Sequence, residues 1–482
     1  MSARYHPVRA TPAARQRGQT IFLAAVFLLF GISAALYATL GTSANSVANR
    51  QAEHDAKVLA QVKEALIGWS AARTPTASNP NARPGELPCP DTDNNGFAEN
   101  DDNNDGIDEA SCAAGTIGRV PWKTLGIPEP KDSTGETLWY AISGNFRVYR
   151  SASPNSFTSA ITSDTLGTLR VDQDSTSNTI TSQAIAVIFA PGVALDTQDR
   201  STTTTMSCSA PSGTYFRNQC AFNYLDSYGG VNNYTANNQF IRGPSSSTFN
   251  DRLLVITNAD LMPAVEQRVA REIISILQQY KVATSSSTLA SLLPGIGVYP
   301  WADRSDGGAN TGWNHNRFPC GSALPFDWDT VPTQGTQATP TLPEWLKNGC
   351  DCTSAGQRGW ACVILYAVAK IKLEDSGAAC NEVCNADTLT VTNPGSRPAD
   401  VCLASVSPFA CTPTVVGTVS ADVVLITSGA ATASRSSGWP NTTFTDPITL
   451  YFEDSENGVN NSDSYTVPRS TNYDRDRIYI IR

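Results

Sequence analysis

Gln19–Leu40, with the sequence QTIFLAAVFLLFGISAALYATL, is a run of 22 residues without a charged side chain. At about 1.5 Å per residue, a helix of this length crosses the roughly 30 Å hydrocarbon core of a bilayer. A cleaved signal peptide usually has a shorter apolar region, of about 7–15 residues, that ends at an A-x-A-like site. This run instead passes into polar sequence at Gly41. It therefore predicts a retained transmembrane helix over residues 19–41.

The charges on the two sides of this run predict its orientation. Residues 1–18 contain four arginines and no acidic residue, whereas the first basic residue after the run is Arg50. Lys and Arg are enriched on the cytoplasmic side of membrane helices. The sequence therefore predicts a single-pass protein, with residues 1–18 as a short basic leader in the cytoplasm and the bulk of the chain outside it.

The overall charge limits the class of partner. The 482 residues include 34 basic and 44 acidic side chains, which gives a formal charge of −10. Without the four leader arginines, 30 basic residues stand against 44 acidic ones, so the remainder carries −14. Such a surface disfavours nucleic acid as a partner and suits divalent cations or basic proteins.

Twelve cysteines predict disulfide bonds formed in an oxidising compartment, in agreement with the predicted topology. Zinc is the alternative, because Cys350–Cys352 and Cys380–Cys384 are closely spaced pairs. However, no C-x-x-C pair occurs, and His315 is the only histidine after His54. Disulfide bonds are therefore the preferred interpretation.

The spacing of the cysteines suggests only some of the pairs. Sequence neighbours would join Cys89 to Cys112 and Cys208 to Cys220. The pairing within the crowded set from Cys320 to Cys411 stays open, because spacing alone does not determine connectivity.

The apolar run is expected to continue as a helix beyond the membrane. No proline occurs from Gln19 to Arg73, and Pro75 and Pro80 follow. The second half of this stretch has apolar side chains at helical spacings of three and four, namely Val58, Val62, Ala65, Leu66 and Trp69. We therefore expect a membrane helix that continues into an amphipathic helix able to pack on a globular part.

The basic leader that ends in Gly18, the apolar run from Gln19 and the amphipathic continuation resemble the type IV pilin and pseudopilin superfamily. The resemblance implies a bacterial inner-membrane protein that a prepilin peptidase cuts between Gly18 and Gln19. It also implies that the apolar helix packs against other pilin-like subunits, with a β-rich head outside. The family usually has a glutamate at the fifth mature position, where this chain has Leu23. That departure leaves open an atypical minor or tip pseudopilin, a Tad-type pilus protein or an ordinary signal-anchored protein.

An acidic stretch after Leu87-Pro88-Cys89-Pro90 has the spacing of a calcium loop. A first frame places oxygen ligands at alternate positions and a glycine, Gly96, at the sharp turn; its ligands are Asp91, Asp93, Asn95, the Phe97 carbonyl and Asp102. A second, overlapping frame consists of Asp101, Asn103, Asp105 and Asp108. Calcium takes six to eight oxygen ligands, so the stretch predicts structural calcium in the first half of the chain. The alternative is a solvated acidic loop with Asn and Gly turns.

Seven segments of the first half recur in the second half in the same order, with offsets from 211 to 237 residues. Examples are Trp139–Ala141 with Leu365–Ala367, and Asn250–Ile256 with Arg475–Ile481. Such self-similarity predicts two related head modules, residues 42–262 with the acidic loop and residues 263–482 with most of the cysteines. The expected fold class is α+β, with the N-terminal membrane helix continuing into an amphipathic helix. Two modules would follow, each with a long helix packed on a mainly antiparallel β-sheet.

No catalytic motif stands out. The chain lacks a G-x-S-x-G elbow, an H-E-x-x-H helix motif, a P-loop and a dinucleotide fingerprint. Three histidines leave little for acid–base chemistry, and we expect that the protein is not an enzyme. The preferred function is a membrane-anchored, pilin-like minor or tip component of a type IV pilus or type II secretion-type assembly, with the head exposed for contact. The alternative is an unprocessed, signal-anchored envelope binding protein or adhesin.

Overall fold

A computed structural model of the chain describes residues 47–76, 79, 82–99, 112, 117–148, 160–195, 197–235, 237–285, 299, 315–318, 342–347, 359–369, 389–393, 401–403, 410–411, 417–427, 464–466 and 477–481. The predicted leader, Gly18, Gln19 and the predicted transmembrane helix lie outside these residues. The chain divides into two compact units, Met1–Lys57 and Val58–Arg482. A helix over residues 47–72 runs across this division.

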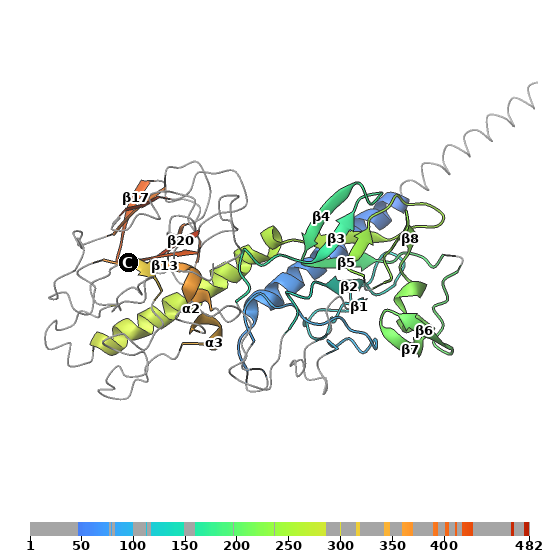
Figure 1. Cartoon of the computed structure of the whole chain (residues 1–482), viewed down its shortest axis with the longest axis horizontal. Coiled ribbons are helices and arrows are strands. Elements are labelled where there is room, and N and C mark those ends of the chain that lie inside the picture. The colour runs from blue at the N-terminus through green and yellow to red at the C-terminus, as the bar shows by residue number, and fades with distance from the viewer. Residues whose placement is uncertain are drawn as a thin grey trace, which may run out of the picture. The chain divides into compact units, whose positions relative to one another are not determined.

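The first half of the chain contains a four-stranded antiparallel sheet with the strand order β1-β2-β5-β11 (Figure 1). These strands are β1 (Ile117–Arg119), β2 (Trp139–Ile142), β5 (Ala186–Ala190) and β11 (Arg252–Ile256). A second sheet has the order β10-β3-β4, with β3 (Leu169–Asp172), β4 (Thr179–Ala184) and β10 (Gln239–Ile241). Because only Ile185 separates β4 from β5, the chain passes directly from one sheet to the other.

Two short ribbons and two 3₁₀ turns complete the first half. The ribbons are β6 (Thr205–Ser209) with β7 (Ser212–Phe216), and β8 (Ser227–Tyr228) with β9 (Val231–Asn232). The turns η1 (Arg217–Gln219) and η2 (Ala221–Asn223) follow β7.

The second half repeats this arrangement and adds to it. Its larger sheet has the order β12-β13-β18-β20-β15-β16, and its smaller sheet has the order β17-β14-β19. The strands are β12 (His315–Arg317), β13 (Ile364–Val368), β14 (Leu389–Asn393), β15 (Val401–Leu403), β16 (Ala410–Cys411), β17 (Gly417–Ala421), β18 (Val423–Thr427), β19 (Ser464–Thr466) and β20 (Arg477–Ile481). After residue 285, the described helices are α3 (Glu344–Lys347) and the 3₁₀ turn η4 (Trp360–Val363).

Both halves use the same strand register. Tyr140 lies opposite Ile188, which lies opposite Leu254 in the first sheet. At the corresponding positions of the second sheet, Tyr366 lies opposite Leu425, which lies opposite Tyr479. The single residue between sheets also makes equivalent backbone bonds, since the N–H of Ile185 donates to Ile256 and that of Asp422 donates to Ile481. The segments that recur in sequence therefore occupy equivalent strands.

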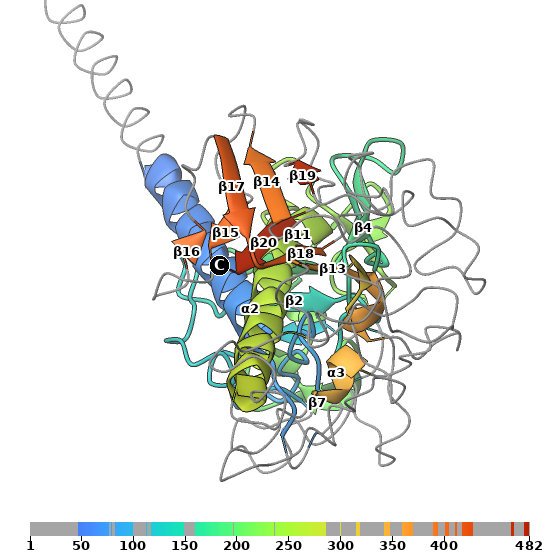
Figure 2. The ribbon, with the colours of Figure 1, turned by 90° about the vertical axis from the view of Figure 1, so that its left-hand side faces the viewer.

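The longest described helix, α2 (Asn258–Ser285), begins two residues after β11. Its apolar side chains share one core with Leu59, Val62, Leu66 and Ile67 of the first helix and with both larger sheets. Figures 1 and 2 show the ribbon of α2 beside the strands of the second half. Members of this core include Leu66, Ile273 on α2, Ile188 on β5 and Leu425 on β18. We call this cluster the helix core.

The first sheet is buried on both faces, which explains the continuous apolar run of β5. Ile188 belongs to the helix core. Its neighbours Val187 and Phe189 face a separate cluster with Trp139 and with Phe240 of β10. A strand covered on both sides needs no polar alternation. Short apolar runs bounded by turn or polar residues, as at residues 184–190 and 253–257, are typical of buried strands, and the structure has β5 and β11 there.

The predicted fold class is wrong. The described part of the chain is mostly sheet, and no helix within it is both long and apolar enough to cross a membrane. Within the described ranges, the two modules do not each have a long helix packed on a sheet of their own, because both long helices contribute to one shared core. The buried positions of α2, which extend from Leu261 to Tyr280, cover more than half of the helix circumference at about 100° per residue. Because one sheet face cannot cover so wide an apolar surface, α2 packs within a core shared by both halves.

Candidate functional site

The acidic loop begins at Asp91, which pairs with Arg119 of β1 at the edge of the first sheet. The N–H of Asp91 donates to the carbonyl of Arg119 at 2.9 Å, and the N–H of Arg119 donates back to the Asp91 carbonyl at 2.6 Å. A disulfide between Cys89 and Cys112, with a Cα–Cα distance of 5.7 Å, closes the segment. Gly118 is required here, because a Cβ atom at this position would lie 2.4 Å from the Asp91 carbonyl oxygen. The loop is therefore fixed at its base by the backbone and by a covalent bond.

The Asp91 carboxylate folds the loop around itself. Asp91 is buried, and its two oxygens accept hydrogen bonds from the N–H groups of Asn94 and Gly96, each at 2.8 Å. Asn94 and Gly96 have positive φ angles of 66° and 88°, which turn these N–H groups inward. The pKa of Asp91 is raised to about 7, mainly by burial; the nearby Asp93 contributes to this rise, and the hydrogen bond from the Gly96 N–H opposes it. The loop thus holds a carboxyl group that ionises near neutral pH.

Asp93 and Asn95 form the outer part of the loop. One Asp93 oxygen accepts the Asn95 N–H at 3.1 Å, and the other accepts the Asn95 amide at 3.0 Å. The Asn95 side-chain oxygen accepts the Phe97 N–H at 2.7 Å. The Lys123 ammonium donates to the Asn95 carbonyl oxygen at 2.5 Å and lies 4.9 Å from the Phe97 ring centroid. The positively charged Lys123 side chain therefore lies against the oxygen-rich side of the loop.

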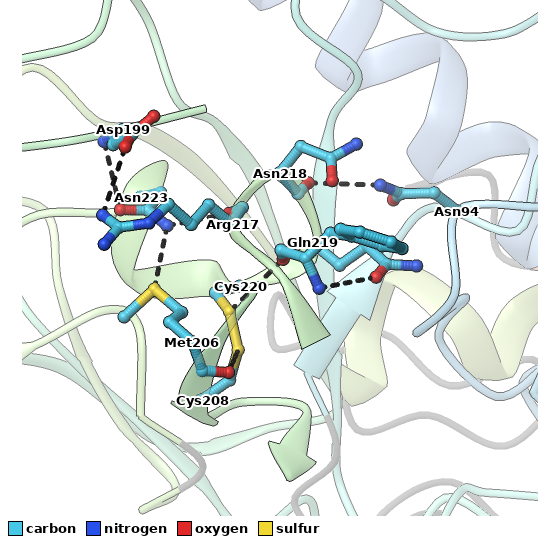
Figure 3. The surroundings of a disulfide bond; sticks show 10 residues. Asn94, Asp199, Met206, Cys208, Arg217, Asn218, Gln219, Cys220 and Asn223 are labelled. Atoms are coloured by element: carbon cyan, nitrogen blue, oxygen red, sulfur yellow. Dashed lines mark hydrogen bonds and ion pairs between the residues drawn. A yellow bond between two sulfur atoms is a disulfide. The ribbon is translucent and has the colours of Figure 1, made fainter. Parts of the chain in front are cut away.

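The tip of the loop is held by a distant segment of the chain (Figure 3). Asn94 donates to the carbonyl of Asn218 at 3.1 Å, and Gln219 donates to the carbonyl of Asp93 at 2.8 Å. The next residue, Cys220, forms the second disulfide with Cys208 of β6. The acidic loop and the β6–β7 ribbon therefore meet across η1.

Part of the predicted ligand set lies within the described residues. Asp91, Asp93, Asn95 and Phe97 are described and lie in one loop. The remaining predicted ligands, namely Asp101, Asp102, Asn103, Asp105 and Asp108, lie outside the described residues. Among the residues that the structure describes, no group of three or more His, Cys, Asp or Glu side chains is placed to hold a metal ion. Each Asp91 oxygen accepts one N–H and retains a lone pair, so this carboxylate still fits a cation ligand.

Sequence analysis predicted no role for Arg119, which is buried between two aromatic rings. Its guanidinium carbon lies 4.5 Å from the Trp139 ring centroid and 3.9 Å from that of Tyr224. Its side chain also donates to the Thr137 carbonyl. Burial lowers the pKa of Arg119, and contact with Tyr224 opposes this shift. The G-R-x-P-W segment was the available signal, since an arginine between apolar residues needs partners.

A hydrogen-bond network around the carboxylates of Asp226 and Asp251 was also not predicted from the sequence. Its residues lie in segments that recur in the second half. Asp251 accepts hydrogen bonds from the Asp226 N–H at 2.8 Å and from the Asn233 amide at 2.9 Å. Asp226 accepts the Asn250 N–H at 2.7 Å and the Gln198 amide at 2.8 Å. Burial raises the pKa of both carboxyl groups, and the Asp226 charge raises that of Asp251 further. The network ties the β8–β9 region to the start of β11, which gives it a structural role.

A third polar group, Glu266, lies inside the helix core. It is fully buried on α2, accepts a hydrogen bond from Ser163 and forms an ion pair with Arg477 of β20. The Thr427 hydroxyl also lies 3.4 Å from its carboxylate. Burial raises the pKa of Glu266, and the Arg477 charge opposes that shift. The sequence signal for such a pair was a glutamate between Val265 and the apolar residues Val269 and Ile273 at helical spacing.

No protein-family model matches the chain, and no curated protein or solved structure is significantly similar to it.

Proposed function

We propose that this chain is a pilin-like minor or tip component of a type IV pilus or type II secretion-type assembly, held at the bacterial inner membrane by residues 19–40. The observation that carries the proposal is the basic leader ending in Gly18, followed directly by an uncharged run of 22 residues. Positive charge before such a run favours a cytoplasmic N-terminus and an external head. The apolar segment is then the surface for other pilin-like subunits.

Two features of the head support an external location. The described residues contain two disulfides, Cys89–Cys112 and Cys208–Cys220, which are the two neighbour pairs suggested by spacing. Disulfide bonds persist in the periplasm and outside the cell. The first half also has a sheet buried on both faces with a disulfide-closed loop at its edge, which suits an exposed head.

Leu23 and the size of the head favour a tip position. A family glutamate at this position is thought to neutralise the terminal amine of a neighbouring subunit, and Leu23 cannot do so. A first subunit in a filament does not need that contact. A head that continues to residue 482 would also crowd a repeating filament.

The mature N-terminal residue tests the proposal. We expect mass spectrometry of membranes from the native host to find a chain that starts at Gln19. Gly18→Leu should abolish this cleavage, whereas Gly31→Ala, inside the apolar run, should leave it intact. A wild-type chain that starts at Met1 or Ser2 would reject the pilin-like function.

The second candidate is an unprocessed, signal-anchored envelope binding protein or adhesin, and Leu23 is the observation that favours it. In this case residues 1–18 stay attached, and the apolar segment serves only as an anchor. The same measurement separates the two candidates, because only the pilin-like function requires a start at Gln19.

We also propose that the acidic loop binds calcium in a structural role, with Asp91, Asp93 and Asn95 as ligands together with predicted ligands of residues 97–108. Support comes from the buried Asp91 carboxylate and from the alternate spacing of oxygen-bearing side chains. Calorimetric titration of the full-length chain in detergent should detect calcium binding that Asp93→Ala weakens at least about tenfold. Asp174→Asn is the matched control, since Asp174 is an exposed carboxylate on another loop. Equal calcium affinity in all three proteins, or no binding to the wild type, would reject the site.

A further inference from the structure

The second half of the chain contains an insertion that the first half lacks. In the first half, residues 173–178 join β3 to β4. In the second half, residues 394–416 lie between the equivalent strands β14 and β17 and include β15 and β16. β15 pairs in parallel with β20, and β16 pairs antiparallel with β15. The insertion therefore extends the larger sheet by two strands beyond β20.

The register of this added pair places two cysteines directly opposite each other. Cys402 of β15 is the partner of Cys411 of β16, and Leu403 is the partner of Ala410. Directly opposed residues of an antiparallel pair have Cα atoms about 4.5 or about 5.5 Å apart. A disulfide requires a Cα separation of about 4.4–6.8 Å, so both kinds of opposed position satisfy it. Residues in register also lie on the same face of the sheet.

We propose that Cys402 and Cys411 form a disulfide bond that holds the inserted hairpin on the edge of β20. The two thiols lose two protons and two electrons as the S–S bond forms. A thiol–disulfide oxidoreductase of the oxidising compartment accepts the electrons, and its own disulfide is reduced to a dithiol. The bond resolves one pair in the cysteine set for which sequence spacing left the connectivity open.

The size of the hairpin explains why it needs a covalent bond. β15 has three residues and β16 has two, and an isolated two-stranded hairpin is at best marginally stable in water. The hairpin nevertheless occupies the edge of β20, whose equivalent in the first half, β11, pairs only with β5 among the described residues. A disulfide between the two strands would keep them paired while β15 holds its register on Ile478–Ile480.

Peptide mapping of the full chain tests the bond directly. The protein is purified from an oxidising compartment, alkylated without reduction and digested before Asp400 and after Phe409, which separates the two cysteines. Cleavage before Asp387 separates both from Cys380 and Cys384. We expect one cross-linked pair of peptides that contains Cys402 and Cys411 and is lighter by two hydrogens than the reduced peptides. Alkylated Cys402 or Cys411, or a cross-link from either to another cysteine, would overturn the proposal.

Two single substitutions provide a second test that does not depend on the digest. Cys402→Ser should expose a single alkylatable thiol at Cys411, and Cys411→Ser should expose one at Cys402. Cys208→Ser is the matched control and should expose Cys220 instead, because its partner is known. A thiol exposed elsewhere by Cys402→Ser would overturn the pairing even if the wild-type map were ambiguous.

Discussion

The buried carboxyl group of Asp91 makes the acidic loop sensitive to pH. Its pKa is raised from 3.8 to about 7, so between these values the folded chain holds a proton that the unfolded chain releases. The contribution of Asp91 to the free energy of unfolding is therefore complete below pH 3.8 and is lost as pH rises through about 7. We expect the calcium-free protein to have a lower melting temperature at about pH 8 than at about pH 5 on account of this group.

Calcium should oppose this loss, because a cation bound to Asp91 replaces the proton. Below about pH 7 the calcium affinity should fall by up to about tenfold for each pH unit. Melting curves with calcium and with a chelator, recorded at both pH values, measure the effect. Asp91→Asn should remove both the pH effect and the calcium effect, and Asp174→Asn should keep them. A wild-type midpoint that chelation leaves unchanged at both pH values would contradict the calcium proposal.

Gly96 has a backbone conformation that residues with a side chain rarely adopt. Its φ angle is 88°, and a Cβ atom would lie 2.8 Å from the Trp122 ring. We expect Gly96→Ala to lower the free energy of unfolding by about 1–3 kcal/mol, measured by chemical denaturation. Gly126→Ala separates the two causes, since Gly126 has a positive φ of 66° but no atom within 4 Å of the added Cβ. If both variants lose the same stability, contact with Trp122 contributes nothing.

Glu266 contacts both halves, since it accepts a hydrogen bond from Ser163 of the first half and forms an ion pair with Arg477 of the second half. Glu266→Gln removes the charge of the carboxylate that pairs with the Arg477 guanidinium. We expect a loss of about 3 kcal/mol in denaturant unfolding, at the lower end for a broken buried ion pair, because the Arg477 side chain is 21% exposed. The double variant Glu266→Leu with Arg477→Leu should recover much of this loss, since it leaves no unpaired charge. A double variant as unstable as the two single losses added together would show that the pair is not the cause.

At the scale of elements, η1 connects the β6–β7 ribbon to the acidic loop. The Cys208–Cys220 disulfide fixes one side of η1, and the hydrogen bonds from Asn94 and Gln219 fix the other. Replacing both cysteines by serine should therefore increase amide hydrogen exchange at Asn94 and Gly96. The amides of β5 should keep their protection, because this strand is fully buried and hydrogen-bonded to β2 on one side and β11 on the other. Unchanged exchange in the loop would show that η1 does not stabilise it.

The elements also show what the sequence could predict. Strands at residues 184–190 and 253–257 were predictable because their apolar runs end at turn residues or polar sequence, and the structure contains β5 and β11 there. The amphipathic helix pattern was visible from Val58 to Trp69, and residues 47–72 are helical. The partner of α2 was not predictable. Helical periodicity identifies an apolar face, but it does not say whether one sheet or two will cover it.

The candidate site was also predictable only in part, because a local sequence pattern does not contain contacts between distant segments. The spacing of Asp91, Asp93 and Asn95 identifies a tight oxygen-rich turn, and the structure has one there. Spacing could not reveal the Lys123 ammonium on the Asn95 carbonyl or the contact with Gln219, because 28 and 126 residues separate these partners along the chain. Such contacts depend on strand order, which a local pattern does not contain.

At the scale of the whole molecule, the helix core predicts cooperative unfolding of Val58–Arg482. Ile273 of α2 belongs to a cluster that includes Ile188 of the first sheet and Leu425 of the second. Ile273→Ala should cost about 2–5 kcal/mol and should reduce hydrogen-exchange protection in both β5 and β18. Phe240→Ala, in the separate cluster beside β5, is the control and should affect β5 alone. Protection lost only in β18 after Ile273→Ala would indicate two independent folding units.

The passage of one strand between two sheets has a mechanical consequence. β4 becomes β5 through Ile185, and β17 becomes β18 through Asp422, so in each half a single extended backbone links an outer layer to the layer on the helix core. A pull on the outer layer is then carried by covalent bonds into β5 or β18 rather than by side-chain contacts between layers. The load reaches antiparallel neighbours on both sides of that strand, which resist it together as a shear across many hydrogen bonds. A head built in this way would transmit tension without its layers separating.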